Sequence, residues 1–225
     1  MAFSDLFTRR RKEEPSDAVD GPGQPTKALD RFLAGLSGRT APVLLDLGPV
    51  VGSNVTFFGQ EVGCKILVED LSKDIDRHVT EGKLEELPQF FDTRFPQESE
   101  TIDGILCWDI FDYLDKGAGE RLARQLKRVL RPDGVLLAFF TTAEPRPTAP
   151  PPTYTKHVVV DRGHLQHKPY AAARAKQRPI LNRDIQRLFE PLRVTENFLL
   201  KTNLREVLFR KPPKPPAIEM GSGVI

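Results

Sequence analysis

Apolar residues along the chain fall into two patterns. In some segments they recur every three or four positions, which predicts amphipathic helices, and in others they form short unbroken runs, which predicts buried strands. Helices are predicted over residues 28–36, 54–60, 72–78, 83–87, 115–130 and 182–189. Strands are predicted over residues 43–45, 65–68, 105–108 and 135–140. Because these strands alternate with helices, they indicate a parallel sheet with right-handed crossovers.

The carboxyl end of the chain has a different pattern. Two strand-like segments, 194–200 and 205–209, flank a short turn at Thr202-Asn203. A connection this short favours an antiparallel pair. The fold class is therefore α/β, with a doubly wound, mostly parallel sheet that ends in an antiparallel hairpin.

Proline marks the limits of the folded region. The chain has 225 residues and 20 prolines, about twice the average share of roughly 5%. The proline clusters predict a disordered arm over 1–25, an extended connector over 144–153 and a disordered tail over 211–225. Residues 26–210 are then expected to form a single domain.

Hydrophobicity and cysteine content bear on the compartment. No stretch of the sequence approaches the ~18 apolar residues of a membrane-spanning helix. The segment MAFSDLFTRRRKEE has its charges after a very short apolar patch, unlike a secretory signal. Cys64 and Cys107 lie in or beside predicted strands, which favours buried thiols over a disulfide. We therefore predict a cytoplasmic protein.

The net charge of +2 is unevenly distributed. Residues 1–40 carry +1, residues 41–140 carry −7 and residues 141–225 carry +8. In the basic third, cationic side chains concentrate at Arg162, Lys168, Arg174, Lys176, Arg178, Arg183 and Arg187. One hypothesis is a basic rim or lid that recruits an anionic small molecule, and the alternative is a solvated loop and helix face. A single aromatic residue among these bases argues against nucleic acid.

The candidate chemistry is concentrated after the first predicted strand. Asp46 ends that strand, and Gly48 and Gly52 follow in the turn. Ligands of doubly wound sheets bind at the carboxyl ends of the strands, where glycine lets the backbone approach them. The second strand ends in Glu69-Asp70, where a carboxylate can accept hydrogen bonds from ribose hydroxyls. Together these features favour a nucleoside-containing ligand.

The spacing in this turn distinguishes between two nucleoside-binding patterns. The dinucleotide pattern G-x-G-x-x-G fails because Val50 and Ser53 stand where glycines are needed. The pattern D-x-G-x-G-x-G is met by Asp46, Gly48 and Gly52 and is broken only by Val50. Here the chain resembles the class I S-adenosylmethionine-dependent methyltransferases of small-molecule type. Residues 102–140 resemble the same family from its fourth strand to its fifth, so the similar region covers about 41–140.

The resemblance implies a Rossmann-like, seven-stranded sheet and S-adenosylmethionine as cofactor. In the family's arrangement, Asp46 would orient the methionine end of the cofactor, with Gly48 and Gly52 beneath it. Asp70 would hold the ribose hydroxyls, with Glu69 as the alternative if the strand register differs by one.

The resemblance assigns the rest of the cofactor site less directly. Asp92 occupies the place of an acid near the adenine amino group, although the third strand of the family is barely visible here. Trp108 would flank the adenine or the methionine, and Asp109 would lie at the mouth of the site. Val50 departs from the family, because its Cβ is expected to crowd the cofactor loop.

Catalysis by a methyltransferase needs in-line positioning, and a general base only where the acceptor must lose a proton. Asp109, Asp112 and Tyr113, or the histidines of the carboxyl third, are the candidate bases, and the residues do not choose among them. The sequence lacks the Asn/Asp-Pro-Pro-aromatic element of base amino methylation and any Pro-Cys pair. The His164-Leu165-Gln166-His167 segment has no acid or Cys cluster to complete a metal site, so none is predicted.

Two other functions stay open. The first is a non-catalytic protein of methyltransferase fold that serves as a binding or scaffold module. The second is a peripheral membrane contact through Phe3, Leu6 and Phe7 followed by the basic run 9–12. One short apolar turn with four charges gives only marginal membrane affinity.

Overall fold

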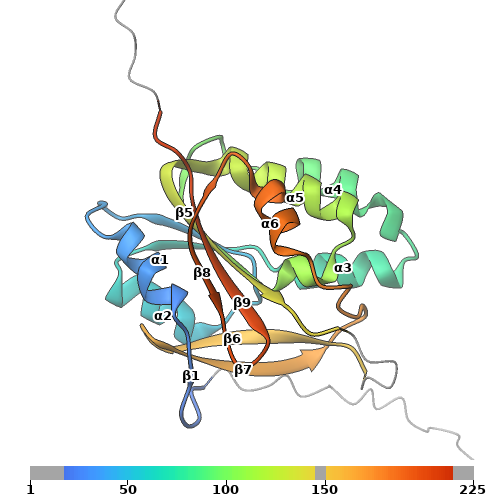
Figure 1. The fold of residues 1–225 in the computed structure, drawn as a ribbon, viewed down its shortest axis with the longest axis horizontal. Helices are drawn as coiled ribbons and strands as arrows, with labels where there is room; N and C mark the ends of the chain where they lie inside the picture. The colour runs from blue at the N-terminus through green and yellow to red at the C-terminus, as the bar shows by residue number, and fades with distance from the viewer. Residues whose placement is uncertain (1–17, 145–150, 215–225) are drawn as a thin grey trace, which may run out of the picture.

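A six-stranded sheet forms the centre of the protein, which is described by a computed structural model over residues 18–144 and 151–214 (Figure 1). In spatial order its strands are β3 (Lys65–Val68), β2 (Val43–Asp46), β4 (Ile102–Trp108), β5 (Leu130–Thr141), β9 (Leu204–Arg210) and β8 (Arg193–Leu199). The first four are parallel, whereas β9 is antiparallel to both of its neighbours. The predicted α/β class and the closing antiparallel hairpin are confirmed.

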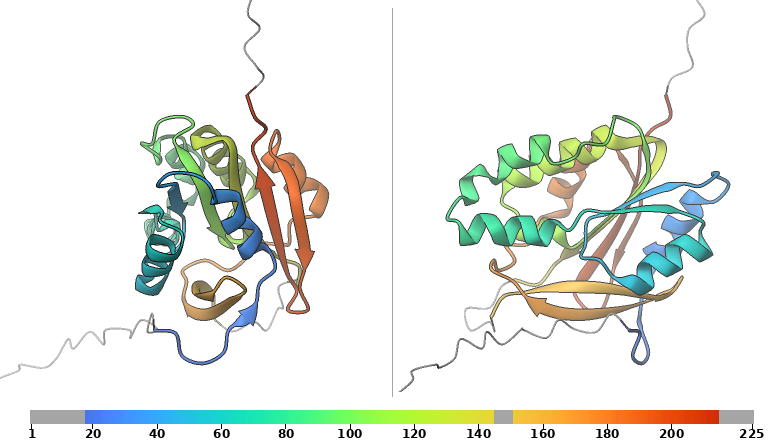
Figure 2. Two further views of the ribbon diagram at one scale, coloured as in Figure 1. Left: turned by 90° about the vertical axis from the view of Figure 1, so that its left-hand side faces the viewer. Right: turned by 180° about the vertical axis from the view of Figure 1, so that it is seen from behind.

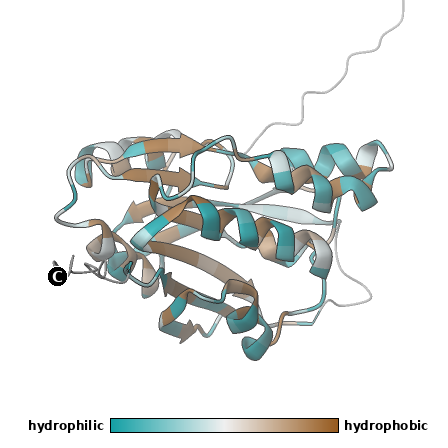
Figure 3. Cartoon of the chain, turned by 90° about the horizontal axis from the view of Figure 1, so that it is seen from above, coloured by the Kyte–Doolittle hydropathy of each residue, from teal (hydrophilic) through white to brown (hydrophobic). Residues whose placement is uncertain are grey.

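Helices cover both faces of this sheet (Figure 2). One face carries α1 (Ala28–Leu36) and α2 (Gly52–Glu61), and the other carries α3 (Leu71–Thr80), α4 (Leu87–Thr93), α5 (Lys116–Val129) and α6 (Asn182–Phe189). Two short 3-10 helices, η1 (Leu84–Glu86) and η2 (Ile110–Tyr113), join them. The apolar strands lie between helices whose outer faces are hydrophilic, so the core has one layer on each side of the sheet (Figure 3).

The expectation of seven strands in the central sheet is wrong, because β3 is its edge. The segment between α3 and β4, where a further strand was expected, contains η1 and α4. Leu87 and Phe91 are fully buried, whereas Gln89 between them is exposed. In a strand all three would lie on one face, so this pattern fits a helix. The sequence pattern here therefore selects a helix that packs beside α5.

A second, three-stranded sheet crosses one end of the central sheet (Figures 1 and 2). It consists of β1 (Gln24–Pro25), β7 (His164–Ala171) and β6 (Thr153–Asp161), all antiparallel. We predicted a connector up to residue 153 and a basic loop after it, and this part of the prediction is wrong. The strand pattern is masked because the buried residues of β6 include Lys156 and His157 beside the valines.

The amino-terminal boundary of the domain also lies earlier than predicted. Gln24–Pro25 pairs with β7, so the arm predicted over 1–25 is ordered at its end. The backbone N–H groups of Lys27 and Ala28 both donate to Glu206 Oε2, at 2.8 Å each. Glu206 is 1% exposed and lies on β9, so this carboxylate caps α1 from the other end of the chain.

Other predictions about the chain ends lie outside the described residues. These are the arm over 1–17 with its proposed membrane contact, the connector over 145–150 and the tail over 215–225. Within the described residues, Cys64 and Cys107 are free and buried, as predicted. None of the described helices combines the length and hydrophobicity needed to cross a membrane.

Candidate functional site

The carboxyl ends of β2, β3 and β4 meet at one edge of the sheet, where they place three acidic residues. Asp46 ends β2, Asp70 follows β3 and Asp109 follows β4. Asp46 and Asp109 are buried, and Asp70 is partly buried. The three acids thus lie at the same edge of the sheet, and their role in binding a cofactor stays a prediction.

Asp46 is held by two donors from the chain itself. Its Oδ1 accepts hydrogen bonds from the backbone N–H of Gly48, at 2.9 Å, and from Nε1–H of Trp108, at 2.7 Å. Burial raises the pKa of Asp46 to about 6, although both hydrogen bonds act in the opposite direction. The carboxylate that would orient the methionine of the cofactor is therefore already bonded to the indole.

Gly48 makes room for Trp108. A Cβ on Gly48 would lie 2.9 Å from Cδ1 of Trp108, which is closer than real Cβ atoms approach their neighbours. A Cβ on Gly52 would meet nothing within 4 Å. Val50 is 58% exposed, and the crowding of a bound cofactor by its Cβ stays a prediction.

The hairpin β6–β7 closes the crevice over Trp108. The imidazole of His157, on β6, stacks on the indole with ring centroids 5.0 Å apart and an interplanar angle of 7°. Its Nε2 lies 3.1 Å from Oδ1 of Asp109, and its Nδ1 lies 3.0 Å from Nδ1 of His167 on β7. Lys176 Nζ donates to Asp109 at 2.7 Å and to Asp112 at 3.0 Å.

Charges in this cluster compensate one another. Burial opposes ionisation of Asp109, but His157 and Lys176 outweigh it and hold the pKa of Asp109 well below its usual range. Burial raises the pKa of Asp112 to about 6 in spite of Lys176. Burial also lowers the pKa of His167 to about 4, so His167 is neutral near pH 7.

None of the three candidate bases is available to a substrate in this arrangement. Asp109 and Asp112 share the ammonium group of Lys176. Tyr113 donates its hydroxyl proton to the carbonyl of Thr153 at 2.6 Å, and burial raises the pKa of the phenol well above its usual value. The general-base role of these residues stays a prediction.

Further contacts fasten the hairpin to the helices. The side chain of Asn54, on α2, donates to the carbonyl of His157 and accepts from the N–H of Val159, both at 2.8 Å. On the side of α3, the Tyr154 hydroxyl donates to Asp76 at 2.7 Å. The hairpin is thus hydrogen-bonded on both sides of the crevice.

Asp70 is joined to the hairpin through a relay. The Tyr170 hydroxyl donates to Ser72 Oγ at 2.9 Å, and Ser72 donates to Asp70 Oδ1 at 2.5 Å. Asp70 Oδ2 is buried and accepts no hydrogen bond, although Lys73 Nζ lies 3.2 Å away. Of the predicted ribose ligands, Asp70 is thus the one with an unsatisfied acceptor.

The other two predicted cofactor acids have structural partners. Glu69 accepts hydrogen bonds from Arg94, at 2.6 Å, and from Gln97, at 3.1 Å. Asp92 accepts from Arg121 at 2.7 Å, which ties α4 to α5, and it does not line the crevice. Asp92 is absent from the crevice because the strand expected before β4 is the helix α4. Asp92 therefore lies on a helix and not at the end of a strand.

A cavity of about 20 Å³ remains beside Trp108, between the end of β4 and the hairpin. That volume holds roughly one water molecule, whereas small-molecule sites occupy about 300–1,000 Å³. The residue types at the strand ends fit a nucleoside, and Asp70 Oδ2, which accepts no hydrogen bond, suits a ribose hydroxyl. The cavity beside Trp108 does not fit S-adenosylmethionine, because the hairpin and the indole fill that part of the crevice.

The predicted basic lid is divided between different places. Lys176 joins the acidic cluster, Arg174 lies 3.8 Å from Asp115, and Arg178 lines a separate pocket beside α5 and α6. His164 pairs with Asp161. No group of three or more potential metal ligands occurs within the part of the chain that the structure describes.

Sequence reasoning missed the hairpin contacts of His157 and Asn54 and the pairing partners of Lys176. Asn54 had a signal, since it lies two residues after Gly52 in the first turn of α2, next to the crevice. The histidines of the carboxyl third were candidate bases, but nothing in the sequence singled out His157, because its role depends on where the hairpin folds back.

Comparison with known proteins supports the fold. The chain is similar to the *Burkholderia thailandensis* 1,6-didemethyltoxoflavin-N1-methyltransferase, solved with its substrate and S-adenosylhomocysteine, at 17% identity and a TM-score of 0.50 over 83% of this chain and 77% of that one. It is also similar to a SAM-dependent methyltransferase from *Aquifex aeolicus*, at 16% identity and a TM-score of 0.46 over 81% and 88% of the two chains. The chain thus has the fold of class I S-adenosylmethionine-dependent methyltransferases. No family model and no curated protein matches it.

Proposed function

We propose that this protein is a binding module built on the methyltransferase fold, and that it does not transfer methyl groups. One observation carries the proposal: the hairpin stacks on Trp108 at the end of β4 and leaves a cavity of only about 20 Å³ beside the indole. The carboxylate oxygens of Asp46 and Asp109 that a cofactor would use already contact Trp108 and His157 of the chain itself. The crevice therefore serves the stability of the fold.

Opening the crevice would be costly. Tyr154, His157 and Val158 are buried by the contact between the hairpin and the rest of the domain. Moving the hairpin away would expose these side chains and would break the contact between His157 Nε2 and Asp109 Oδ1. Exposing apolar surface to water costs about 25 cal/mol per Å². A ligand would have to supply that free energy in addition to its own binding.

The test is calorimetric titration of the full chain with S-adenosylhomocysteine and with S-adenosylmethionine. We expect no saturable heat at ligand concentrations up to about 1 mM. A Kd of about 1 mM corresponds to a binding free energy of only about −4 kcal/mol. Native mass spectrometry of the purified protein should likewise find neither molecule bound. A micromolar Kd, or co-purified cofactor, contradicts the proposal.

Two variants sharpen this titration. Val50→Gly restores the glycine pattern of the family but leaves Trp108 in place, so it should not create binding. Trp108→Ala removes the side chain that occupies the loop and is the variant in which weak binding would first appear. Binding to Val50→Gly with none to the wild type would assign the block to the loop and not to the hairpin.

A second candidate is a S-adenosylmethionine-dependent methyltransferase that acts on a small, anionic acceptor. The buried Asp70 Oδ2 favours it, since this oxygen accepts no hydrogen bond and lies where the family binds the ribose. For that function the hairpin would have to move away from Trp108. Transfer of labelled methyl groups to a small-molecule extract, lost in Asp70→Asn, would establish it. Both candidates include the prediction of a cytoplasmic protein, which cell fractionation would test.

A further inference from the structure

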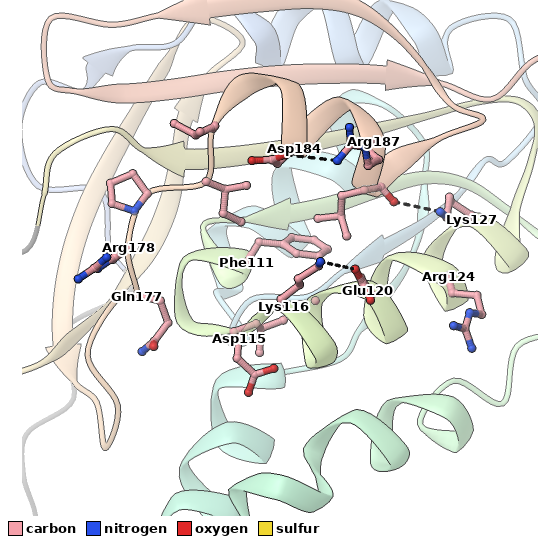
Figure 4. A pocket seen from close by; sticks show the side chains of 16 residues that line it. Phe111, Asp115, Lys116, Glu120, Arg124, Lys127, Gln177, Arg178, Asp184 and Arg187 are labelled. Carbon is pink, nitrogen blue, oxygen red and sulfur yellow. Dashed lines mark hydrogen bonds and ion pairs between the residues drawn. The ribbon is translucent and has the colours of Figure 1, made fainter.

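A large pocket lies on the helical side of the molecule, apart from the closed crevice. It has a volume of about 900 Å³ and lies between α5, α6 and residues 177–181 (Figure 4). A volume of this size is within the usual range for small-molecule sites, about 300–1,000 Å³. The contrast with the 20 Å³ left at the strand ends indicates where a ligand can be held.

The floor and one wall of this pocket are apolar. Phe111, 1% exposed, lies in the middle, between α5 and α6 (Figure 4), and Leu114, Ile180 and Leu188 also line the pocket. Leu181 is 56% exposed at the edge of the pocket, which is unusual for a leucine in this protein. Gly119 contributes no side chain to the wall, so the surface of α5 is hollowed at this position. These features suit a flat or branched hydrocarbon body.

The rim of the pocket is positively charged. Five basic and three acidic residues line it, and the bases are Lys116, Arg124, Lys127, Arg178 and Arg187. Each acid has a basic neighbour: Arg174 lies 3.8 Å from Asp115, Lys116 lies 3.9 Å from Glu120 and Arg187 lies 3.8 Å from Asp184. The five bases that line the pocket therefore outnumber its three acids, and the lining has an excess of positive charge.

Arg178 is placed to meet an anion. It is exposed at one end of the pocket, with Arg124 at the other end (Figure 4). Lys127 also brings positive charge to the pocket, where its Nζ donates to the carbonyls of Leu188 and Glu190. A guanidinium group on a short, partly buried segment binds carboxylates, sulfonates and phosphates through paired N–H donors.

We propose that this α5–α6 pocket binds a small amphipathic anion, with its apolar body on Phe111 and its acidic group at Arg178. This proposal rests on the proposed function, since it gives the binding module a class of ligand. It needs neither S-adenosylmethionine nor the residues of the closed crevice. A peptide or a second copy of the chain would need the same apolar floor, and the experiment below separates these occupants.

The probe is 8-anilinonaphthalene-1-sulfonate, an aromatic anion whose fluorescence rises in apolar sites. N-phenyl-1-naphthylamine, which has the same aromatic body and no charge, is the matched comparison. We expect saturable binding of about one sulfonate per chain, and Arg178→Gln should weaken it about threefold or more because a charge-assisted hydrogen bond is lost. The same variant should change binding of the neutral probe less than twofold. Arg183→Gln, an exposed base on α6 that does not line the pocket but lies 3.8 Å from Asp184, should change binding of either probe less than twofold.

A second variant blocks the pocket without touching its charges. A Cβ on Gly119 would have Phe111 as its nearest neighbour, at 3.8 Å, so Gly119→Met can be accommodated and places its side chain against the floor. Methionine also favours a helix more than glycine does. Binding of both probes should fall at least tenfold, while near-ultraviolet circular dichroism stays like that of the wild type.

Three outcomes would overturn the proposal. These are probe binding that does not saturate, equal effects of Arg178→Gln and Arg183→Gln, and a dimer that dissociates in Leu181→Arg. A dimer that dissociates in Leu181→Arg would mean that a second copy of the chain covers the α5–α6 pocket. Failure of this proposal can be distinguished from failure of the proposed function. Binding of S-adenosylhomocysteine would contradict the proposed function, but it would not change the titration with the two probes.

Discussion

The indole of Trp108 and the imidazole of His157 lie parallel at the centre of the crevice, 5.0 Å apart between ring centroids. Each ring also bonds to a carboxylate at a strand end, Trp108 to Asp46 and His157 to Asp109. This pair therefore joins β2, β4 and β6 through two stacked rings and two hydrogen bonds. The positions that a nucleoside would use are linked by the chain itself.

Trp108→Phe should show how much the indole N–H contributes. The phenyl ring can still stack on His157, but Asp46 Oδ1 keeps only the donor of Gly48. Loss of a hydrogen bond to a buried carboxyl group should lower the free energy of unfolding by about 1–3 kcal/mol. Urea denaturation at pH 7 measures this. An unchanged midpoint would mean that the bond to Asp46 adds nothing to the stack.

The two glycines of the loop should differ when each is replaced by alanine. In Gly48→Ala the new Cβ would lie 2.9 Å from the indole, so Trp108 must shift, and overpacking of this kind costs about 1–3 kcal/mol. In Gly52→Ala nothing lies within 4 Å, and a less flexible unfolded chain should raise stability by about 0.4–1 kcal/mol. Thermal unfolding of the two variants in parallel provides the comparison. Equal losses in both would contradict this account of the loop.

Asn54 should be important for the hairpin although it is not on it. Asn54→Leu has nearly the same volume but leaves the carbonyl of His157 and the N–H of Val159 without partners. Each buried, unsatisfied group costs about 1–3 kcal/mol, so we expect a large drop in the urea midpoint. Hydrogen exchange should show lost protection in β6 before the central sheet is affected.

Asn54→Asp is the matched control for this substitution. Aspartate still accepts from Val159 but cannot donate to the His157 carbonyl, so its exchange rates should lie between those of Asn54→Leu and the wild type. Full protection of β6 in Asn54→Leu would show that the hairpin does not depend on this bridge.

Asp46→Asn should change the dependence of stability on pH. The folded-state pKa of Asp46 is about 6, above the ordinary 3.8, so the folded protein holds this proton more tightly than the unfolded chain. The stability that this proton gives is complete below about pH 4 and is lost as the pH rises through 6. At about 1.4 kcal/mol per pKa unit, the loss amounts to roughly 3 kcal/mol by pH 8.

Asparagine does not titrate, so the variant avoids this loss. Its free energy of unfolding, relative to that of the wild type, should rise by roughly 3 kcal/mol between pH 4 and pH 8. Asp112 and His167 titrate in the same range, but they are present in both proteins and cancel in the difference. A difference that stays flat with pH would falsify the raised pKa.

The sequence predicts the central sheet well because its signal is local. Leu44 and Leu45, like Ile105 and Leu106, are adjacent and fully buried, as expected for strands covered on both faces. Their parallel direction follows from alternation with helices, and the acids at their carboxyl ends then share one edge. The turn after β2 likewise identified Asp46 and Gly48 as residues of the crevice.

The hairpin could not be predicted in the same way. Its buried residues include Tyr154, Lys156 and His157, so neither an alternating nor a fully apolar pattern appears. Its position depends on contacts with Asn54 and Trp108, which are about 100 and 50 residues away in sequence. A glycine in a loop indicates that something approaches closely, but only the fold reveals whether that is a ligand or a tryptophan.

The carboxylate of Glu206 connects the beginning of the fold to its end. It accepts the N–H groups of Lys27 and Ala28 at the start of α1, and it is itself on β9, between β5 and β8. A ribosome must therefore finish almost the whole domain before the first helix acquires its cap. Contacts this distant in sequence form late and slow folding. During synthesis α1 depends on its own propensity and on packing, and completion of β9 fixes both ends of the domain in one step.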